Sequence, residues 1–272
     1  MKGGNALEFP VIAFIGGDKR MMYACDALIE MGAEVCYCGF ENYEGDATKC
    51  RSAVDAVVQS SVCVFPINYP LHEIEALMQL NPNALYAGGL VSGKLEGIYD
   101  YLSDEKLTTL NAIPTAEGAL MIAIRETHST VKDAKVLVLG YGRVGKAVSR
   151  LFCAAGAKVS VAARNKRDLA TCEIYGCRPC EIEMLGSYIG EADIIINTVP
   201  AHVADAKVLD RVSCESLIID LASKPGGIDF EYAKNAGLRV IWALSLPSAV
   251  APKTSGTLIA GSIVSFIERQ CK

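Results

Sequence analysis

The sequence predicts an α/β protein with two open parallel sheets of the Rossmann type, joined by a bridging helix, and a C-terminal helix that crosses back to the first domain. Short apolar runs alternate with helical patterns along the 272 residues, which is typical of parallel strands connected by crossover helices. A glycine fingerprint occupies residues 140–145. The length is sufficient for two α/β domains.

The first domain is expected to comprise residues 1–113. Residues 11–15 predict a strand that leads into Gly16-Gly17-Asp18, and residues 21–31 predict a helix that ends at Gly32. Further strands are expected at 34–38, 62–65, 84–87 and 107–110, with helices at 71–80 and 94–102. Because the turn after the first strand lacks the full fingerprint, we expect this domain to face the substrate or a partner protein.

The second domain is expected to span residues 114–250 and to open with a bridging helix over 114–128. Pro114 suits the first turn of that helix, because its fixed φ is helical and first-turn N–H groups have no partner within a helix. Strands are predicted at 136–139, 158–163, 193–197, 217–221 and 238–242. A helical pattern over 251–268 predicts the helix that crosses back, so residues 251–272 are assigned to the first domain.

The fingerprint Gly140-x-Gly142-x-x-Gly145 carries the clearest chemical signal. It follows an apolar strand pattern and precedes a helical one, which is the context that a dinucleotide-binding turn requires. The glycines permit a tight turn and close approach of the backbone to a pyrophosphate, and the helix N-terminus presents free N–H groups. We therefore expect Gly140, Gly142, Arg143, Val144 and Gly145 to bind a dinucleotide.

The turn after the second strand of this domain favours NADP over NAD. NAD-selective domains usually place Asp or Glu there, to hold the ribose 2′-hydroxyl. This chain has Arg164-Asn165-Lys166-Arg167, with no carboxylate before Asp168. Arg164, Asn165 and Lys166 are the expected contacts to a 2′-phosphate. The alternative is a solvated basic loop with no ligand.

Later strand ends complete the expected cofactor site. Thr198 and Pro200 follow the strand at 193–197, and Ala222 follows the strand at 217–221. Ligands in open α/β sheets bind outside the carboxyl ends of strands, so these residues are expected to line the ribose and nicotinamide. An ordinary strand-ending turn is the alternative interpretation.

A small anionic substrate would require cations and hydroxyls at the same edges. Arg20, Ser223, Lys253 and Thr254 are the candidates for binding its carboxylates, and Glu117 and Lys253 are the candidates for acid–base catalysis. For each of these residues, an ordinary solvated loop position without a ligand is at least as good an explanation. The three histidines have no spacing that indicates a metal site or a catalytic triad.

Composition and charge exclude several functional classes. The net charge of −5 argues against a nucleic-acid-binding surface. No uninterrupted apolar run reaches the roughly 18 residues of a membrane span, and the first ten residues lack a signal-peptide pattern. A cytoplasmic protein with reduced thiols is expected. Cys172-x4-Cys177-x2-Cys180 matches part of an iron–sulfur spacing, but packing within the sheet explains it better, so no metal is expected.

Four segments in order resemble the family of the dipicolinate synthase A subunit. The most specific are Asp-Leu-Ala-Ser-Lys-Pro-Gly-Gly within residues 220–230 and Ala-Pro-Lys-Thr-Ser-Gly within residues 246–256; residues 15–20 and 111–118 supply the others. The resemblance implies oxidation of a dihydrodipicolinate intermediate to pyridine-2,6-dicarboxylate, with NADP as hydride acceptor. It also implies that the flavoprotein-like dipicolinate synthase B subunit is the partner, and that the chain acts in the mother cell during sporulation.

Two other functions remain open at this point. One is an NADP-dependent two-domain oxidoreductase that acts on another small carboxylate. The other is a nucleotide-binding scaffold protein that has no turnover of its own. The sequence leaves the oligomeric state undecided, and a homo-oligomer is compatible with it.

Overall fold

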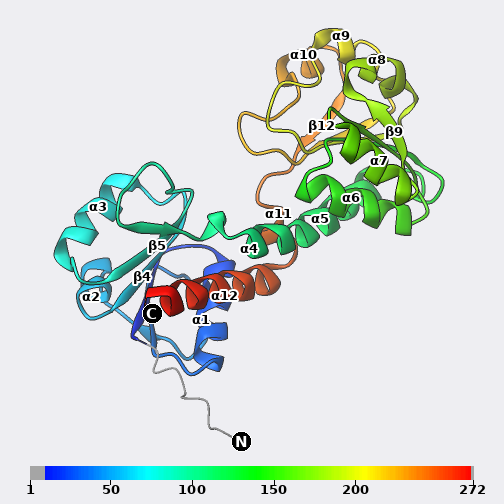
Figure 1. Cartoon of the computed structure of the whole chain (residues 1–272). Helices are drawn as coiled ribbons and strands as arrows, with labels where there is room; N and C mark the ends of the chain where they lie inside the picture. Colours follow the sequence, from blue (N-terminus) through cyan, green and yellow to red (C-terminus); the bar gives the residue numbers. More distant parts are fainter. Residues whose placement is uncertain (1–9, 271–272) are drawn as a thin grey trace, which may run out of the picture. The chain divides into compact units, whose positions relative to one another are not determined.

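The computed structural model describes residues 10–270, which divide into two compact units (Figure 1). One unit contains the described residues up to Asn111 together with those from Ala251 onward, and the other runs from Ala112 to Val250. Each unit is built on one six-stranded parallel sheet. The predicted fold class of two open parallel sheets is therefore confirmed.

The sheet of the first unit has the order β3-β2-β1-β4-β5-β6. Its central strand β1 is fully apolar and buried, as expected of a strand that is covered on both faces. The elements are β1 (Ile12–Ile15), α1 (Lys19–Glu30), β2 (Val35–Cys38), β3 (Thr48–Lys49), α2 (Ala53–Val58), β4 (Val62–Ile67), α3 (Leu71–Leu80), β5 (Leu85–Gly89), β6 (Ile98–Asp100), η1 (Tyr101–Ser103), α4 (Glu105–Leu110) and α12 (Pro252–Gln270).

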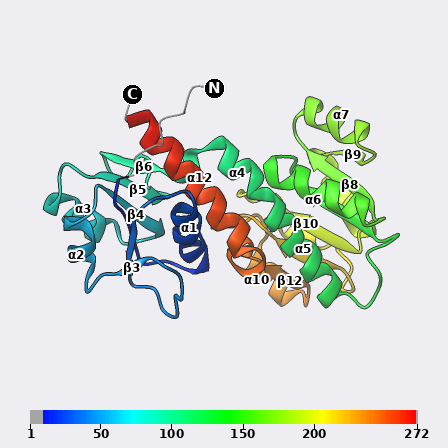
Figure 2. The ribbon, with the colours of Figure 1, turned by 90° about the horizontal axis from the view of Figure 1, so that it is seen from below.

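Helices α1 and α12 cover one face of this sheet, and α2 and α3 cover the other. The last helix lies along α1, as both views of the ribbon show (Figure 1, Figure 2). Gly256 makes this packing possible, because a Cβ there would overlap the carbonyl oxygen of Arg20 and would lie 2.9 Å from the amide nitrogen of Ala24. The C-terminal helix is thus part of the first unit's core.

Two predictions in this unit are wrong. Residues 107–110 were expected to form a strand but belong to helix α4, because the Asp104 carboxylate accepts hydrogen bonds from the amides of Lys106 and Leu107 and caps the helix. Residues 94–102 were expected to be helical but contain β6 and the turn η1. Gly97 has a φ of +72° and interrupts the helical pattern.

The sheet of the second unit has the order β12-β11-β10-β7-β8-β9. Strand order therefore reverses between β7 and β10, and the crevice at their carboxyl ends is where open α/β sheets bind ligands. The elements are α5 (Ala112–Glu126), β7 (Lys135–Leu139), α6 (Arg143–Ala154), β8 (Lys158–Ala163), α7 (Lys166–Ile174), β9 (Arg178–Glu181), η2 (Ile182–Met184), α8 (Leu185–Tyr188), η3 (Ile189–Glu191), β10 (Ile194–Asn197), α9 (Ala206–Leu209), β11 (Leu217–Asp220), α10 (Phe230–Asn235), β12 (Arg239–Trp242) and α11 (Leu246–Val250).

One face of this sheet is covered by α5, α6 and α7, and the other by α8, α9 and α10. Helix α5 also packs closely on α11, since Gly118 faces Leu246 with room for no larger side chain. By length and composition alone, the stretch Glu105–Glu126 is apolar enough to cross a membrane, and 44% of its most apolar window is buried. Packed core helices have the same composition, so this is weak evidence for a span.

Two glycines of α12 provide a matched test of its packing on α1. Gly256→Ala should lower the free energy of unfolding by about 1–3 kcal/mol, because the added methyl meets backbone atoms of α1. Gly261→Ala should raise it by about 0.5–1 kcal/mol, because no atom lies within 4 Å of its added Cβ and alanine is the better helix former. Thermal unfolding of both variants measures the difference, and equal effects would contradict the described packing.

Candidate dinucleotide site

The glycine fingerprint forms the turn between β7 and α6. Gly140 has a φ of +92°, which side chains rarely adopt. A Cβ at Gly145 would overlap the carbonyl oxygen of Gly140, so the third glycine permits the turn to close. Gly142 precedes the first residue of α6, and no atom lies within 4 Å of where its Cβ would be. The backbone at Gly142 is therefore open to a phosphate at the N-terminus of a twelve-residue helix.

Tyr141 lies inside this turn but is buried beneath it. Burial raises the pKa of its phenol to about 12, and neighbouring thiols add to the effect. The ammonium group of Lys146 lies 5.5 Å from the centre of its ring. Tyr141 is thus a neutral packing residue at physiological pH rather than a base.

A buried polar pair organises the next two loops along this edge. The side-chain amide of Asn197, at the end of β10, donates to the Asp220 carboxylate at the end of β11 over 2.8 Å. The other Asp220 contacts are the amides of Ala222 and Gly227, each at 2.9 Å. Asn197 also closes its own turn through Val199, whose amide donates to the Asn197 side-chain oxygen at 3.1 Å. Both side chains are fully buried and satisfied.

A pocket of about 380 Å³ opens between these loops and the turn after β8. Its walls come from the ends of β7, β8 and β10 and from the turn after β9. Glycine and apolar side chains make up most of the lining, and Arg164 and His202 are its two groups able to carry positive charge. The lining residues are Gly140, Ala163, Arg164, Ile182, Val199, Ala201, His202 and Val203. An apolar slot with a cationic side suits a purine nucleoside bearing a phosphate.

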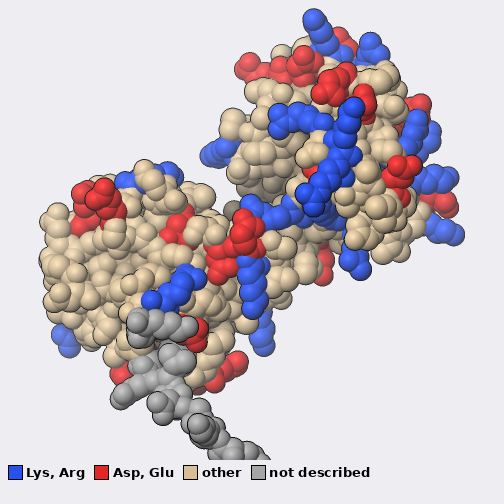
Figure 3. All heavy atoms as spheres, in the orientation of Figure 1, with Lys and Arg blue, Asp and Glu red and all other residues tan. Residues whose placement is uncertain are grey.

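The turn after β8 places the predicted cationic residues at the strand's end, as expected. Arg164 is exposed beside the pocket. The Asn165 side chain caps α7 by accepting a hydrogen bond from the Arg167 amide at 2.8 Å, so its carbonyl oxygen is engaged while its NH₂ group remains a donor. Lys166 is the first residue of α7. Figure 3 shows basic side chains interspersed with acidic ones over the viewed face of this unit.

Thr198 and Ala222 have structural roles at the same edge. The Thr198 hydroxyl donates to the carbonyl oxygen of Leu139 at 2.8 Å, and a Cβ at Gly140 would meet that hydroxyl. The Ala222 amide is held by Asp220, while Pro200 is exposed. Ile182 and His202 were not among the predicted site residues; the position of His202 two residues after Pro200, in a strand-end loop, was the available signal.

The candidate substrate residues fall in both units. In the first, Arg20 is on α1, and Lys253 and Thr254 are exposed in the first turn of α12, whose Gly256 contacts the Arg20 backbone. The Arg20 guanidinium holds the Asp18 carboxylate through two atoms, with Nε–Oδ1 at 3.0 Å and Nη2–Oδ2 at 2.7 Å. In the second unit, Ser223 and Glu117 are exposed, the latter on α5.

The cysteines of the considered iron–sulfur spacing lie in the second unit's core. Burial raises the pKa of Cys172 to about 11 and that of Cys177 to about 12, so both are neutral thiols at physiological pH. The sulfur of Cys177 lies 3.6 Å from that of Cys153. Within residues 10–270, no three His, Cys, Asp or Glu side chains are arranged to hold a metal ion.

Comparison with known proteins identifies both units. Residues 11–92 match the N-terminal domain of the dipicolinate synthase A subunit, and residues 116–222 match the NAD binding domain of D-isomer specific 2-hydroxyacid dehydrogenases. The dipicolinate synthase A subunit of Bacillus subtilis (strain 168) is 32% identical, over 94% of this chain and 95% of that protein. The second unit is accordingly an NAD(P)-binding domain.

Solved structures agree in fold. The crystal structure of the dipicolinate synthase A subunit from Bacillus halodurans has a TM-score of 0.81 and 30% identity, over 94% of this chain and 97% of that chain. A transhydrogenase from Sinorhizobium meliloti has a TM-score of 0.74 at 17% identity, over 95% and 94% of the two chains, and shares the fold.

Substitutions at two fingerprint glycines distinguish an effect on folding from an effect on dinucleotide binding. Gly142→Ala should leave the melting temperature unchanged, because its Cβ has no neighbour and its φ of −75° is ordinary, yet weaken dinucleotide binding at least tenfold by occupying the phosphate approach. Gly145→Ala should destabilise the fold, since its Cβ overlaps Gly140. Calorimetric unfolding and fluorescence titration with NADPH measure both effects. Unchanged binding by Gly142→Ala would mean that the phosphates lie elsewhere.

Proposed function

We propose that this chain, which belongs to the family of the dipicolinate synthase A subunit, oxidises dihydrodipicolinate to dipicolinate with NADP⁺ as the hydride acceptor. The observation that carries the proposal is the dinucleotide edge of the second unit, with Arg164 beside its pocket, in a chain that matches this family over nearly its whole length. The Bacillus subtilis relative is named for synthesis of dipicolinate, which gives the product.

The reaction requires little from the protein beyond positioning. Dihydrodipicolinate loses one hydride, to C4 of the nicotinamide, and one proton, so that dipicolinate, NADPH and H⁺ are formed. The ring becomes aromatic, which favours the reaction. The chain's own task is to hold a ring C–H bond against the nicotinamide and to accept a modest proton transfer.

The edge of the second sheet supplies the cofactor contacts. Gly140, Gly142, Arg143, Val144 and Gly145 bind the pyrophosphate through the turn and the N-terminus of α6. Thr198, Pro200 and Ala222 line the ribose and nicotinamide. Arg164, Asn165 and Lys166 bind the 2′-phosphate, and His202 adds a further donor because it lines the same pocket as Arg164.

The dicarboxylate substrate is bound by Lys253, Thr254, Ser223 and Arg20. Arg20 uses Nε and Nη2 to hold Asp18, which leaves the N–H groups of its other terminal nitrogen for a carboxylate. Lys253 and Thr254 add a cation and a hydroxyl at the N-terminus of the nineteen-residue helix α12. Glu117 and Lys253 are the residues proposed to exchange the proton.

The proposal also places the chain among other proteins. As a member of the A-subunit family, it works with the B subunit of dipicolinate synthase in the cytoplasm of the mother cell during sporulation. Copurification of the two proteins from sporulating cells tests this assignment.

The function is tested by absorbance at 340 nm with freshly generated dihydrodipicolinate and NADP⁺, while dipicolinate is quantified in parallel. One NADPH should appear for each dipicolinate formed, with NADP⁺ used more efficiently than NAD⁺. The Gly142→Ala variant serves as the folded, binding-deficient control. Tight NADPH binding without turnover, even when the B subunit is present, would contradict catalysis by this chain.

The cofactor preference is tested by reversing the charge beside the pocket. Arg164→Asp should weaken NADPH binding about 10- to 100-fold, the equivalent of one charge-assisted hydrogen bond of roughly 1.5–3 kcal/mol, and should leave NADH binding nearly unchanged. His202→Ala should weaken NADPH binding several-fold in the same selective way. Arg150→Asp, on the exposed side of α6, controls for net charge. Equal losses for both dinucleotides would refute the 2′-phosphate assignment.

A further inference from the structure

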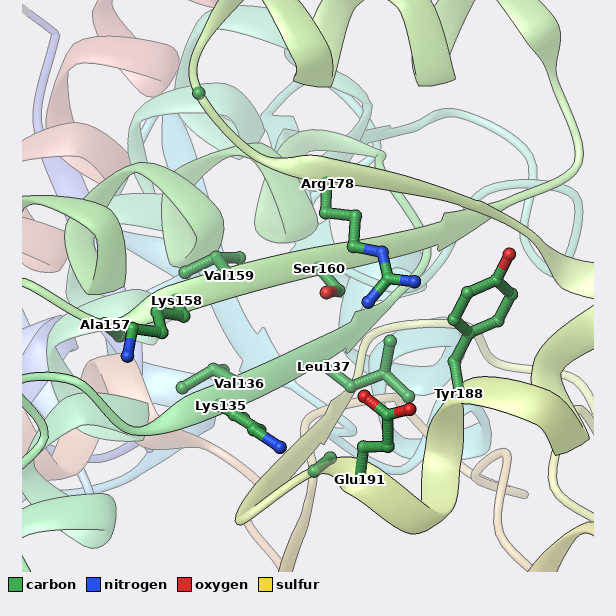
Figure 4. Close-up of a pocket in the computed structure, with 12 residues that line it drawn as sticks. Lys135, Val136, Leu137, Ala157, Lys158, Val159, Ser160, Arg178, Tyr188 and Glu191 are labelled. Carbon is green, nitrogen blue, oxygen red and sulfur yellow. The ribbon is translucent and has the colours of Figure 1, made fainter.

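A second hollow lies on the sheet of the NAD(P)-binding unit, away from the dinucleotide edge (Figure 4). It has a volume of about 420 Å³, the size of a small-molecule site. Its lining comes from the first residues of β7 and β8, the start of β9 and the segment around η3. The fingerprint follows the carboxyl end of β7, so the two sites lie at opposite ends of the same strands.

The hollow forms because the segment that covers this face of the sheet is short. The connection from β9 to β10 contains α8, which has four residues, between two single turns of 3₁₀ helix. Leu185 and Ile189 anchor this connection in the core that includes Leu139. On the opposite face, α6 has twelve residues. The short cover leaves the start of β7 and β8 open, with Leu137 and Ser160 among the lining residues.

Sheet register places three basic residues along the edge of this hollow. Lys135 of β7 pairs with Lys158 of β8, and Ser160 of β8 pairs with Arg178 of β9. Side chains alternate along a strand, so Lys158 and Ser160 share one face. Like charges directly opposite each other destabilise a sheet unless a counter-charge is present. The acid in the lining, Glu191, balances only part of this charge.

Nearby carboxylates neutralise these cations in part, and Asp193 accepts a hydrogen bond from the Lys135 backbone amide at 2.7 Å. Lys158 lies 3.8 Å from Asp133, but both side chains are about two-thirds exposed, so that pair contributes little. The Arg178 guanidinium lies 5.1 Å from the centre of the Tyr188 ring, a contact that orients it without cancelling its charge. Within the described residues, no ion pair involves Lys135 or Arg178. Figure 4 shows Arg178, Ser160 and Glu191 facing the same hollow.

We propose that this hollow binds a small dicarboxylate, with one carboxylate on Lys135 and Lys158 and the other on Arg178. The lysine pair and Arg178 are two residues apart in register, which is about 7 Å along the strand. Two separated positive centres match two separated carboxylates better than one compact phosphate, and the planar guanidinium suits a carboxylate. The half-buried Tyr188 provides apolar contact for the carbon skeleton. This site is additional to the proposed active site and does not depend on that function.

Calorimetric titration of the full-length protein with glutarate, in saturating NADPH, tests the proposal. The native chain should bind, and the double variant Lys135→Gln/Lys158→Gln and the single variant Arg178→Gln should each weaken binding at least tenfold. Lys234→Gln, an exposed lysine on α10, should bind as the native chain does.

The melting temperature provides an independent test of the same charged residues. Lys135→Gln should leave the melting temperature unchanged or raise it without ligand, because it relieves the repulsion from Lys158. Added glutarate should raise the melting temperature of the native chain and not that of the double variant. The proposal is overturned by absence of dicarboxylate binding at millimolar concentration or by equal binding of inorganic phosphate.

Discussion

The hydrogen bond between the buried side chains of Asn197 and Asp220 is the interaction on which the dinucleotide edge depends. It joins the ends of β10 and β11, and the oxygens of the two side chains also accept hydrogen bonds from the amides of Val199, Ala222 and Gly227. A buried carboxylate needs hydrogen-bond donors around it, and leaving a buried polar group without its partner typically costs about 1–3 kcal/mol. The loops that line the pocket are therefore fixed by the core beneath them.

This edge also depends on glycines at positions where a larger side chain would not fit. A Cβ at Gly227 would lie 2.5 Å from the Asn197 side-chain nitrogen, so only glycine lets the loop after β11 close over the pair. At the neighbouring turn, Gly145 is closed in by Gly140 while Gly142 stays open. The polar pair and Gly227 thus fix the loop after β11, while the backbone at Gly142 in the fingerprint turn stays accessible to a phosphate. A preformed edge of this kind binds a cofactor at a lower cost in conformational entropy.

Local patterns predicted most of the fold, and non-local arrangement accounts for what they missed. Alternating apolar runs and the fingerprint identified most strands of both sheets, because periodicity and turn preference depend on residues that are close together in the sequence. Helix α4 was missed because a six-residue helix depends on its Asp104 cap. His202 and Ile182 line one pocket only through sheet order, and Lys135, Lys158 and Arg178 line one hollow only through register. The bidentate contact of Arg20 with Asp18 could likewise be identified only once the first residue of helix α1 was known.

Hydrogen exchange at the amides of Val199, Ala222 and Gly227, followed by NMR without nucleotide, tests most directly whether the edge is preformed. Each amide donates to a buried side-chain oxygen of Asn197 or Asp220. In a preformed edge all three should exchange slowly, as strand amides do, and NADPH should add little protection. Exchange as fast as that of exposed loops, slowed only when NADPH binds, would contradict this and would show that the cofactor orders the edge.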